Sequence, residues 1–441
     1  MSVKHPHSKR KPVPPLAHHR RGIAQQFARF RAAGIGAFSA FLAVLGPGLL
    51  AGLSDDDPAG ITTYSLLGAE HGYRLLWIIP ASTLVLVQFH LMAVRLGAAT
   101  GKGFVGVIRE RWGHGWGYFA VTGLLFANFG TICAEYAGIS AAGSLINIPS
   151  WVSAPLAGLL ISLLVVLGSF HRVERVLLVI SATLALYIVD GILAEPDWAQ
   201  VWHNSVVPHL PVDHAGWIAI AATLGTTLAP WGLAFIQSYA VDKKITLAKL
   251  SWERIDVIIG SLLTGIIGLA IAVACAATLH QAGIQINDAG DAASALQPLA
   301  GRFATLLFGA GLLGAALLAA AVVPLATAYS IAEGVGAAAS LDLDSGRFQL
   351  FYAAFVGLTV AAVSIVSLPG LPLIPFIYAS QVVNAVLLPL HVIALHLLTR
   401  DAGLMGQART GKAGLVAGWV SIALILACVA ALAWSWVGAI G

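Results

Sequence analysis

An acidic run, Asp55-Asp56-Asp57-Pro58, interrupts an otherwise apolar stretch. The apolar arms beside it, roughly residues 38–53 and 61–67, are each shorter than the about 20 helical residues that cross a bilayer, but together they are long enough. A charge at membrane depth costs at least ~2.5–3.5 kcal/mol, so these carboxylates are expected to face a cavity and to have a function. Proline removes a backbone donor, and Gly60 tolerates unwinding. The run therefore predicts a broken helix whose oxygens suit a hard divalent cation.

The alternative interpretation is a loop between two helices, with the three aspartates facing water. Adjacent acids followed by proline are a common turn composition. The apolar flanks, and a charge distribution that needs one crossing at this place, favour the broken helix.

A second interruption occurs in the sixth apolar segment, where residues 223–232 contain Pro230, two glycines and three threonines. Segments one and six are corresponding members of two five-helix halves, and an odd number of helices gives the halves opposite topology. Interrupted helices at matching positions of inverted repeats indicate a substrate site at the bilayer midplane. The alternative is a proline kink without function, which membrane helices tolerate.

The elements that must position these residues are transmembrane helices. Only 10% of the 441 residues are charged and the mean hydropathy is +0.86, whereas soluble domains carry about 25% charged residues. We predict an all-α polytopic membrane protein with eleven crossings. The apolar segments are 38–70 (broken), 75–97, 116–145, 153–170, 175–194, 215–240 (broken), 255–280, 303–335, 350–368, 373–398 and 414–438.

The basic residues predict the orientation. With the N-terminal tail in the cytoplasm, all 24 Lys and Arg residues except Arg74 and Arg302 fall on the inner side. We expect an integral protein of the cell (inner) membrane, with residues 1–35 as a disordered basic cytoplasmic tail and residues 36–441 as the transmembrane domain. The histidines of the tail suggest metal chaperoning as a weaker alternative. The pI near 9.0 reflects this topology and not nucleic-acid binding.

A few further polar residues lie at membrane depth. Glu135, in segment three, is expected to be an auxiliary charge away from both breaks, the alternative being a carboxyl group hydrogen-bonded within the bundle. Gln381, near Asn384 in segment ten, fits a functional role and a helix–helix contact about equally. Asp190 and Glu333 lie near helix ends and are expected to be solvated.

Several motifs together resemble the natural resistance-associated macrophage protein (NRAMP) family. The family's Asp-Pro-Gly-Asn signature, which follows Gly-Pro-Gly, reads Asp57-Pro58-Ala59-Gly60 after Gly46-Pro47-Gly48. Its Met-Pro-His in helix six reads Ala229-Pro230-Trp231, and its Ser-Gln-Val-Val in helix ten is intact at Ser380-Gln381-Val382-Val383. Each motif alone is weak, but their order and spacing over residues 41–398 are specific.

The resemblance implies an eleven-helix bundle of the amino-acid–sodium symporter type that moves divalent metal ions by alternating access. It implies an ion held by the Asp57 carboxylate, by carbonyls near Ser54 and Thr226, and by the Gln381 side chain. Auxiliary positions are Asp56, Gly60, Ala229 and Glu135.

The chain also departs from the family pattern. The family's asparagine ligand is Gly60, its methionine is Ala229 and its helix-six histidine is Trp231. The second acid of helix three is Gly138, and no arginine lies within 350–368. Without a thioether we expect a hard ion, manganese or magnesium, with iron(II) as a further candidate, and weak or absent proton coupling. In lacking this methionine, the sequence resembles a divergent branch that is similar to the family but carries magnesium.

Two other functions fit the sequence less well than metal transport. An organic-solute symporter of the same fold would need a less acidic site, and the run at Asp55–Asp57 disfavours an anionic substrate. An enzyme is disfavoured because the sequence contains neither HExxH nor GxSxG. We therefore expect no cofactor and no nucleic acid; the partners are the metal ion and the lipid bilayer, and the oligomeric state stays open.

Overall fold

The structure is a computed structural model, and it describes residues 47–167, 186–248, 250–287, 289–293, 301, 304–337 and 349–440. These residues belong to one compact unit, Gly46–Gly441. The predicted tail 1–35, the beginning of the first apolar segment and Arg302 lie outside the described residues. So does the first part of the fifth predicted segment, which is described only from Leu186 onward.

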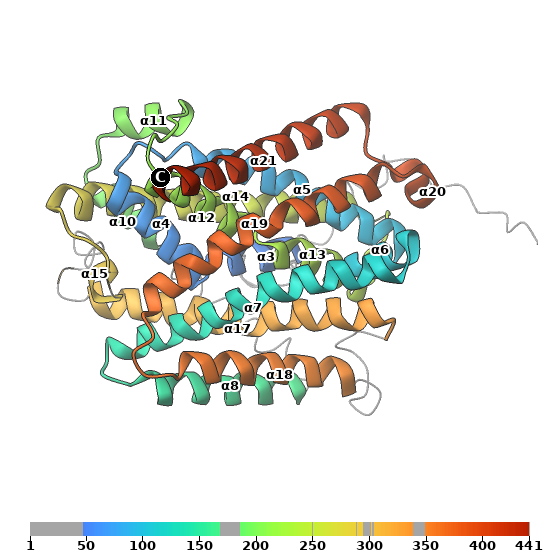
Figure 1. Cartoon of the computed structure of the whole chain (residues 1–441), viewed down its shortest axis with the longest axis horizontal. Helices are drawn as coiled ribbons and strands as arrows, with labels where there is room; N and C mark the ends of the chain where they lie inside the picture. The colour runs from blue at the N-terminus through green and yellow to red at the C-terminus, as the bar shows by residue number, and fades with distance from the viewer. Residues whose placement is uncertain are drawn as a thin grey trace, which may run out of the picture. The chain divides into compact units, whose positions relative to one another are not determined.

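The predicted all-helical class is confirmed (Figure 1). Seven helical spans in the described part are long and apolar enough to cross a membrane, one of them being His214–Asp242 counted across its break, and two apolar helices are shorter. Both predicted breaks are present, because segments one and six each form two helices. The helices of the crossings are α3 (Pro47–Asp55), α4 (Pro58–His71), α5 (Ile78–Thr100), α7 (His114–Ser144), α8 (Ser150–Val166), α10 (Leu186–Leu193), α12 (His214–Thr227), α13 (Pro230–Asp242), α14 (Leu250–Cys275), α17 (Ala304–Val335), α18 (Gln349–Val366), α19 (Leu373–Arg400) and α21 (Lys412–Ile440).

Short helices connect the crossings at the two ends of the bundle. The helices α6 (Phe104–Trp112) and α20 (Ala402–Met405) lie at one end, and α11 (Trp198–Val206) and α15 (Ala289–Ala293) lie at the other (Figure 1). On α6, Arg111 donates to a carboxylate oxygen of Asp401 at 2.6 Å, and this contact lowers the pKa of Asp401 below its ordinary value. The end that carries α6 is also the end at which α13 finishes.

Burial separates central from peripheral helices. In the apolar 18-residue stretch of the sixth crossing, which runs from His214 to Asp242, 94% is buried inside the protein. In the corresponding stretch of α21 only 28% is buried. An apolar surface that the protein leaves uncovered suits lipid. The broken helix α12–α13 is therefore in the centre of the bundle and α21 is at its edge.

Small residues allow the first broken helix to approach its neighbour closely. A β-carbon on Gly52 of α3 would stand 2.4 Å from the carbonyl oxygen of Gly260 on α14, which is too close for any side chain. Close backbone approach through small residues is a main way in which membrane helices associate. It holds α3 firmly beside α14 and fixes the position at which α3 ends.

Candidate metal site at two broken helices

The first break lies between α3 and α4. Asp57 has extended backbone (φ −77°, ψ 178°) and caps α4, because its Oδ1 accepts a hydrogen bond from the Gly60 amide at 2.7 Å. Pro58 has no N–H group, so it cannot donate to the carbonyl of Ser54, four residues earlier. The proline thereby frees a carbonyl at Ser54, beside the three aspartates.

The second break repeats this arrangement. The helix α12 ends at Thr227, Ala229 leaves helical geometry (φ −50°, ψ 130°), and α13 begins at Pro230. Pro230 cannot donate to the carbonyl of Thr226, again four residues earlier. The carbonyl ends of α3 and α12 carry partial negative charge, which suits a cation.

Hydroxyl groups connect the two broken helices. The Tyr64 hydroxyl on α4 lies 2.9 Å from Thr227 Oγ1 on α12. The Ser82 hydroxyl on α5 donates to the same Thr227 oxygen at 3.3 Å. These buried contacts fix α4 and α5 against the C-terminal end of α12, next to the freed Thr226 carbonyl.

The acidic run is buried. Asp55, Asp56 and Asp57 are 2%, 0% and 3% exposed, so the interpretation as a water-facing loop is wrong. Within the described residues, Asp55 Oδ2 and both Asp56 oxygens have no hydrogen-bond partner. Buried polar atoms almost always have partners, and an ion or water is one of the few explanations for exceptions. The run therefore offers oxygen ligands that the protein itself does not satisfy.

Glu135 lies closer to the first break than expected. Its carboxyl group is fully buried and interacts with the carboxyl group of Asp57. One turn later on α7, a β-carbon on Gly138 would stand 2.3 Å from the ring of Pro58. The expectation that Glu135 lies away from both breaks is wrong, because the absence of a side chain at Gly138 lets α7 pack directly on α4.

Replacing Glu135 with glutamine is expected to change the transport rate and its pH dependence, with less than about a threefold change in metal affinity. Glu135 lies on a continuous helix and offers only its side chain, whereas Asp57 lies among freed carbonyls. Flux measured at several pH values, together with metal titration, tests this expectation. A tenfold loss of affinity with an unchanged pH response would instead make Glu135 a direct ligand.

Gln381 lies on α19 beside the second break. A β-carbon on Gly225, the residue before Thr226, would stand 1.8 Å from the Gln381 carbonyl oxygen, so α12 and α19 are in backbone contact. Gln381 Oε1 accepts from Asn384 at 3.0 Å, and Asn384 also donates to Thr131 of α7 at 2.9 Å. Gln381 thus contributes to a helix–helix contact, and its role as a ligand stays a prediction.

A buried histidine that the sequence analysis did not single out faces the acidic run. His90 on α5 is 1% exposed, and its Nδ1 lies 3.3 Å from the Ser261 hydroxyl on α14. Its Nε2 and Asp55 Oδ1 lie 3.4 and 3.5 Å from the position that a β-carbon on Gly232 would occupy. The only sequence signal was an ionisable residue at membrane depth, which is functional by default.

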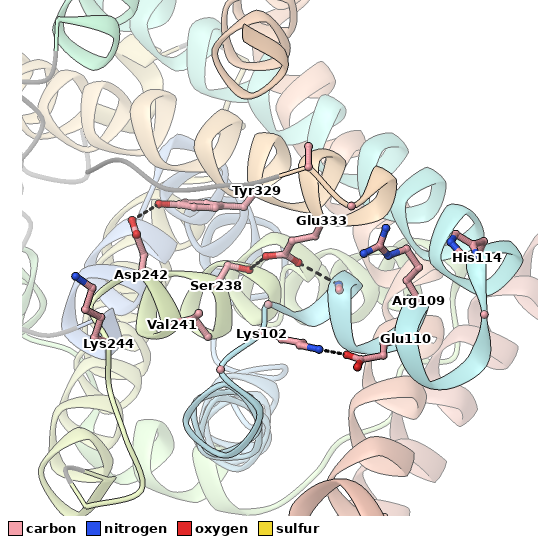
Figure 2. Close-up of a pocket in the computed structure, with 16 residues that line it drawn as sticks. Lys102, Arg109, Glu110, His114, Ser238, Val241, Asp242, Lys244, Tyr329 and Glu333 are labelled. Carbon is pink, nitrogen blue, oxygen red and sulfur yellow. Dashed lines mark hydrogen bonds and ion pairs between the residues drawn. The ribbon is translucent and has the colours of Figure 1, made fainter. Parts of the chain in front are cut away.

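A cavity of about 790 Å³ opens at the end of the bundle where α13 finishes (Figure 2). Charged groups of both signs line it: Lys102, Arg109 and Lys244, and Glu110, Asp242 and Glu333. Within it, Tyr329 donates to Asp242 at 2.7 Å, and Figure 2 shows this contact beside Glu333. The charged groups on its wall make the cavity suited to hydrated ions.

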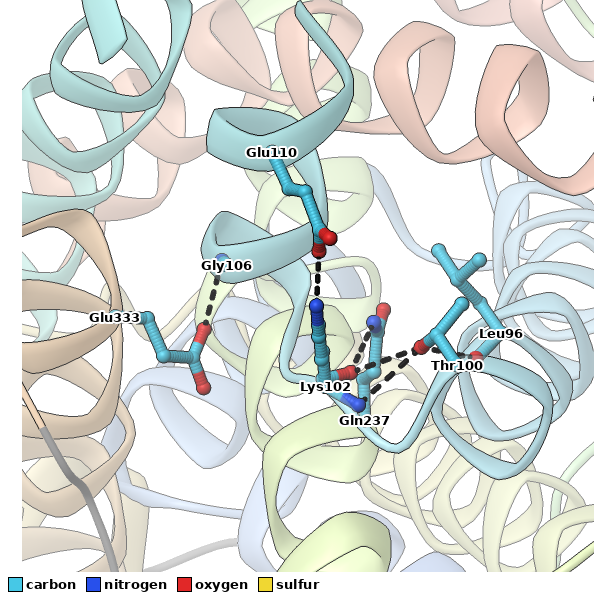
Figure 3. A network of polar contacts seen from close by, with 7 residues as sticks. All are labelled: Leu96, Thr100, Lys102, Gly106, Glu110, Gln237 and Glu333. Carbon is cyan, nitrogen blue, oxygen red and sulfur yellow. Dashed lines mark hydrogen bonds and ion pairs between the residues drawn. The ribbon is translucent and has the colours of Figure 1, made fainter. Parts of the chain in front are cut away.

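Glu333 is not a solvated helix end, contrary to expectation. It is partly buried, and its oxygens accept from the Ser238 hydroxyl of α13 at 2.7 Å (Figure 2) and from the Gly106 amide at 3.3 Å (Figure 3). They also accept from the Val105 amide at 3.2 Å. These amides form the first turn of α6, whose unpaired N–H groups attract a carboxylate. The side chain of Asp190, predicted in the same way, lies outside the described residues.

The connection between α5 and α6 has its own polar network (Figure 3). The Lys102 side chain pairs with Glu110, and its carbonyl accepts from Gln237 of α13 at 3.0 Å. The α13 helix is thus joined to this connection at Gln237 and to α17 at Ser238.

Among the residues that the structure describes, no three His, Cys, Asp or Glu side chains are placed to hold one metal ion. A site at the breaks must therefore combine a carboxylate with backbone or amide oxygens and water. That donor set suits a hard cation.

Two helices broken at matching prolines, with buried carboxylates at the first break, are the arrangement of a secondary membrane transporter. A model of the family described as "Natural resistance-associated macrophage protein-like" matches residues 48–435. The chain belongs to this family. It is an integral membrane protein that transports divalent metal cations, and members of the family are transporters and not enzymes.

Solved structures share the fold at low sequence identity. A mutant of the Eremococcus coleocola manganese transporter is 20% identical over 89% of this chain and 86% of that one, with a TM-score of 0.74. MhsT in complex with L-phenylalanine is 14% identical over 87% and 98%, with a TM-score of 0.61. MHP1, a nucleobase-cation-symport-1 transporter, is 15% identical over 89% and 92%, with a TM-score of 0.52. The predicted symporter-type fold is thereby confirmed.

Proposed function

We propose that this transporter carries a hard divalent cation, manganese or magnesium, held by the Asp57 carboxylate, the carbonyls of Ser54 and Thr226, and the Gln381 side-chain oxygen. The observation that carries the proposal is the repeated offset of four residues between each proline and a freed carbonyl. Asp57 lies next to the first of these carbonyls and supplies the charge that a dication needs.

The small residues at the breaks favour a hard ion. Ala229 and Gly60 supply neither a thioether nor an amide oxygen. Soft ligands select softer metals, whereas carboxylate, carbonyl and water suit magnesium and manganese. The small volume of Ala229 and Gly60 also leaves room for bound water, which magnesium gives up reluctantly. Iron(II) is the third candidate, since it is a divalent ion that also accepts oxygen ligands.

The orientation follows from charge. The end that carries α6 also carries Lys102, Arg109 and Lys244, so we place it in the cytoplasm of a cell (inner) membrane, together with the tail 1–35. The 790 Å³ cavity then faces inward. Toward the other side, the cavity beside α4 measures about 10 Å³, which barely holds one water. We infer an inward-facing arrangement in an alternating-access cycle.

The full chain in liposomes that hold a metal-sensitive dye and a pH-sensitive dye tests this function. Saturable entry of manganese or magnesium is expected, without matched acidification, because Trp231 and Gly138 replace groups of the kind that relay protons.

The two dyes separate the possible failures. Stoichiometric, metal-dependent proton entry would refute the absence of proton coupling but would leave metal transport intact. Absence of any metal flux, with uptake of an organic solute, would favour the alternative of an organic-solute symporter of this fold.

A further inference from the structure

We propose that His90 and Asp55 form a second cation-binding position, on the α13 side of the central site, that favours manganese over magnesium. The proposal rests on the proposed function and deepens it by adding a nitrogen ligand to the path of the ion. Asp55 ends α3, two residues before Asp57, and Gly232 is the third residue of α13. This position therefore lies on the cavity side of both breaks.

The geometry converges on one open point. His90 Nε2 and Asp55 Oδ1 lie 3.4 and 3.5 Å from the place where a Gly232 β-carbon would stand. Because residue 232 is glycine, no side chain of its own occupies that place. Asp55 Oδ2 is buried and has no hydrogen-bond partner in the described part of the chain. The carboxylate thus retains an unsatisfied oxygen.

The orientation of His90 also fits a ligand. Its Nδ1 is 3.3 Å from the Ser261 hydroxyl, which leaves Nε2 to face the open point. Histidines that bind metals usually have their other ring nitrogen held by a hydrogen bond, which fixes the ring and its tautomer. When Nδ1–H donates to Ser261, Nε2 presents its lone pair toward Asp55.

The ligand types decide which ion is favoured. Imidazole binds first-row transition metals, whereas magnesium takes oxygen ligands and keeps its waters. An imidazole with a carboxylate accepts manganese, with water completing the coordination. Two protein ligands bind weakly enough for the ion to leave again, as passage through successive sites requires.

A purely structural histidine would behave differently. It would hydrogen-bond Asp55 directly, and any loss of stability would affect manganese and magnesium transport alike. Gly232→Ala separates the two roles, because the added methyl group would be in ordinary contact with His90 and Asp55. The bundle can tolerate that methyl group, yet the open point would be filled.

The test compares manganese and magnesium flux of the full chain in liposomes, with His90→Gln and Gly232→Ala as variants. Gly357→Ala is the matched control, since a β-carbon at this glycine of α18 meets nothing within 4 Å. We expect both variants to lower manganese transport efficiency at least tenfold and magnesium efficiency less than about threefold. The rise in melting temperature that manganese produces should shrink in the same two variants.

Three outcomes would overturn the proposal. The first is an equal loss of manganese and magnesium transport in the variants. The second is unchanged manganese transport in His90→Gln. The third is a wild-type protein that transports magnesium but not manganese. If Gly232→Ala fails to fold, His90→Gln and its melting shift still decide the question. Loss of flux for both ions in the wild-type protein would instead refute the proposed function itself.

Discussion

Replacing Asp57 with alanine is expected to abolish metal transport while the protein still inserts in the membrane. The substitution leaves a dication facing only dipoles. Two unit charges 4 Å apart near a protein surface interact by on the order of 4 kcal/mol, so a loss of more than about 100-fold in transport efficiency is expected. Flux into dye-loaded liposomes at equal protein density is the measurement.

Two further variants make this result interpretable. Asp57 also caps α4, and losing a cap costs about 0.5–2 kcal/mol. Asp57→Asn keeps a capping oxygen without the charge and should be equally inactive but better folded. Asp197→Ala, at an exposed acid that caps α11, should retain transport. Near-normal flux in Asp57→Ala would remove Asp57 from the metal site.

Cadmium, a soft ion, is expected to be transported poorly by the wild-type protein and better when a thioether is restored by Ala229→Met. Ala229 is 5% exposed and lies at the second break, directly before α13 and three residues after Thr226. A sulfur ligand favours softer metals, and the affinity for cadmium relative to manganese should rise about tenfold. Competition of cadmium with manganese flux measures the ratio.

Ala229→Leu is the matched control, because it adds similar volume without sulfur and should not raise the cadmium ratio. A rise in both variants would mean that volume and not ligand chemistry sets the selectivity. Faster wild-type uptake of cadmium than of manganese and magnesium would show that the site is not hard.

The sequence was sufficient to predict features that a few neighbouring residues determine. Pro58 and Pro230 interrupt apolar segments, and proline acts on the backbone only a few residues away. Both broken helices were therefore predictable, as was the helical fold around them. The burial of the acidic run followed as well, since its apolar flanks left no other way to cross the membrane.

Features that depend on which helices touch were not predictable in this way. In the sequence, Gly138 stands out only as the position of a missing acid. Its packing role becomes visible when α7 packs on Pro58, and this packing also brings Glu135 near Asp57. Gly232 likewise matters only because α5 and α3 bring His90 and Asp55 to it. Glu333 was misjudged because α6, a short helix outside the membrane spans, was not anticipated.

The hydrogen bonds of Glu333 have a mechanical consequence. One carboxylate on α17 holds α13 through Ser238 and α6 through two amides, so α13 cannot swing away from α17 without breaking its contact with the carboxylate. A hydrogen bond to a charged group contributes about 1.5–3 kcal/mol. These contacts therefore favour one position of α13, and any movement of α13 away from α17 has to break the hydrogen bond between Ser238 and Glu333 first.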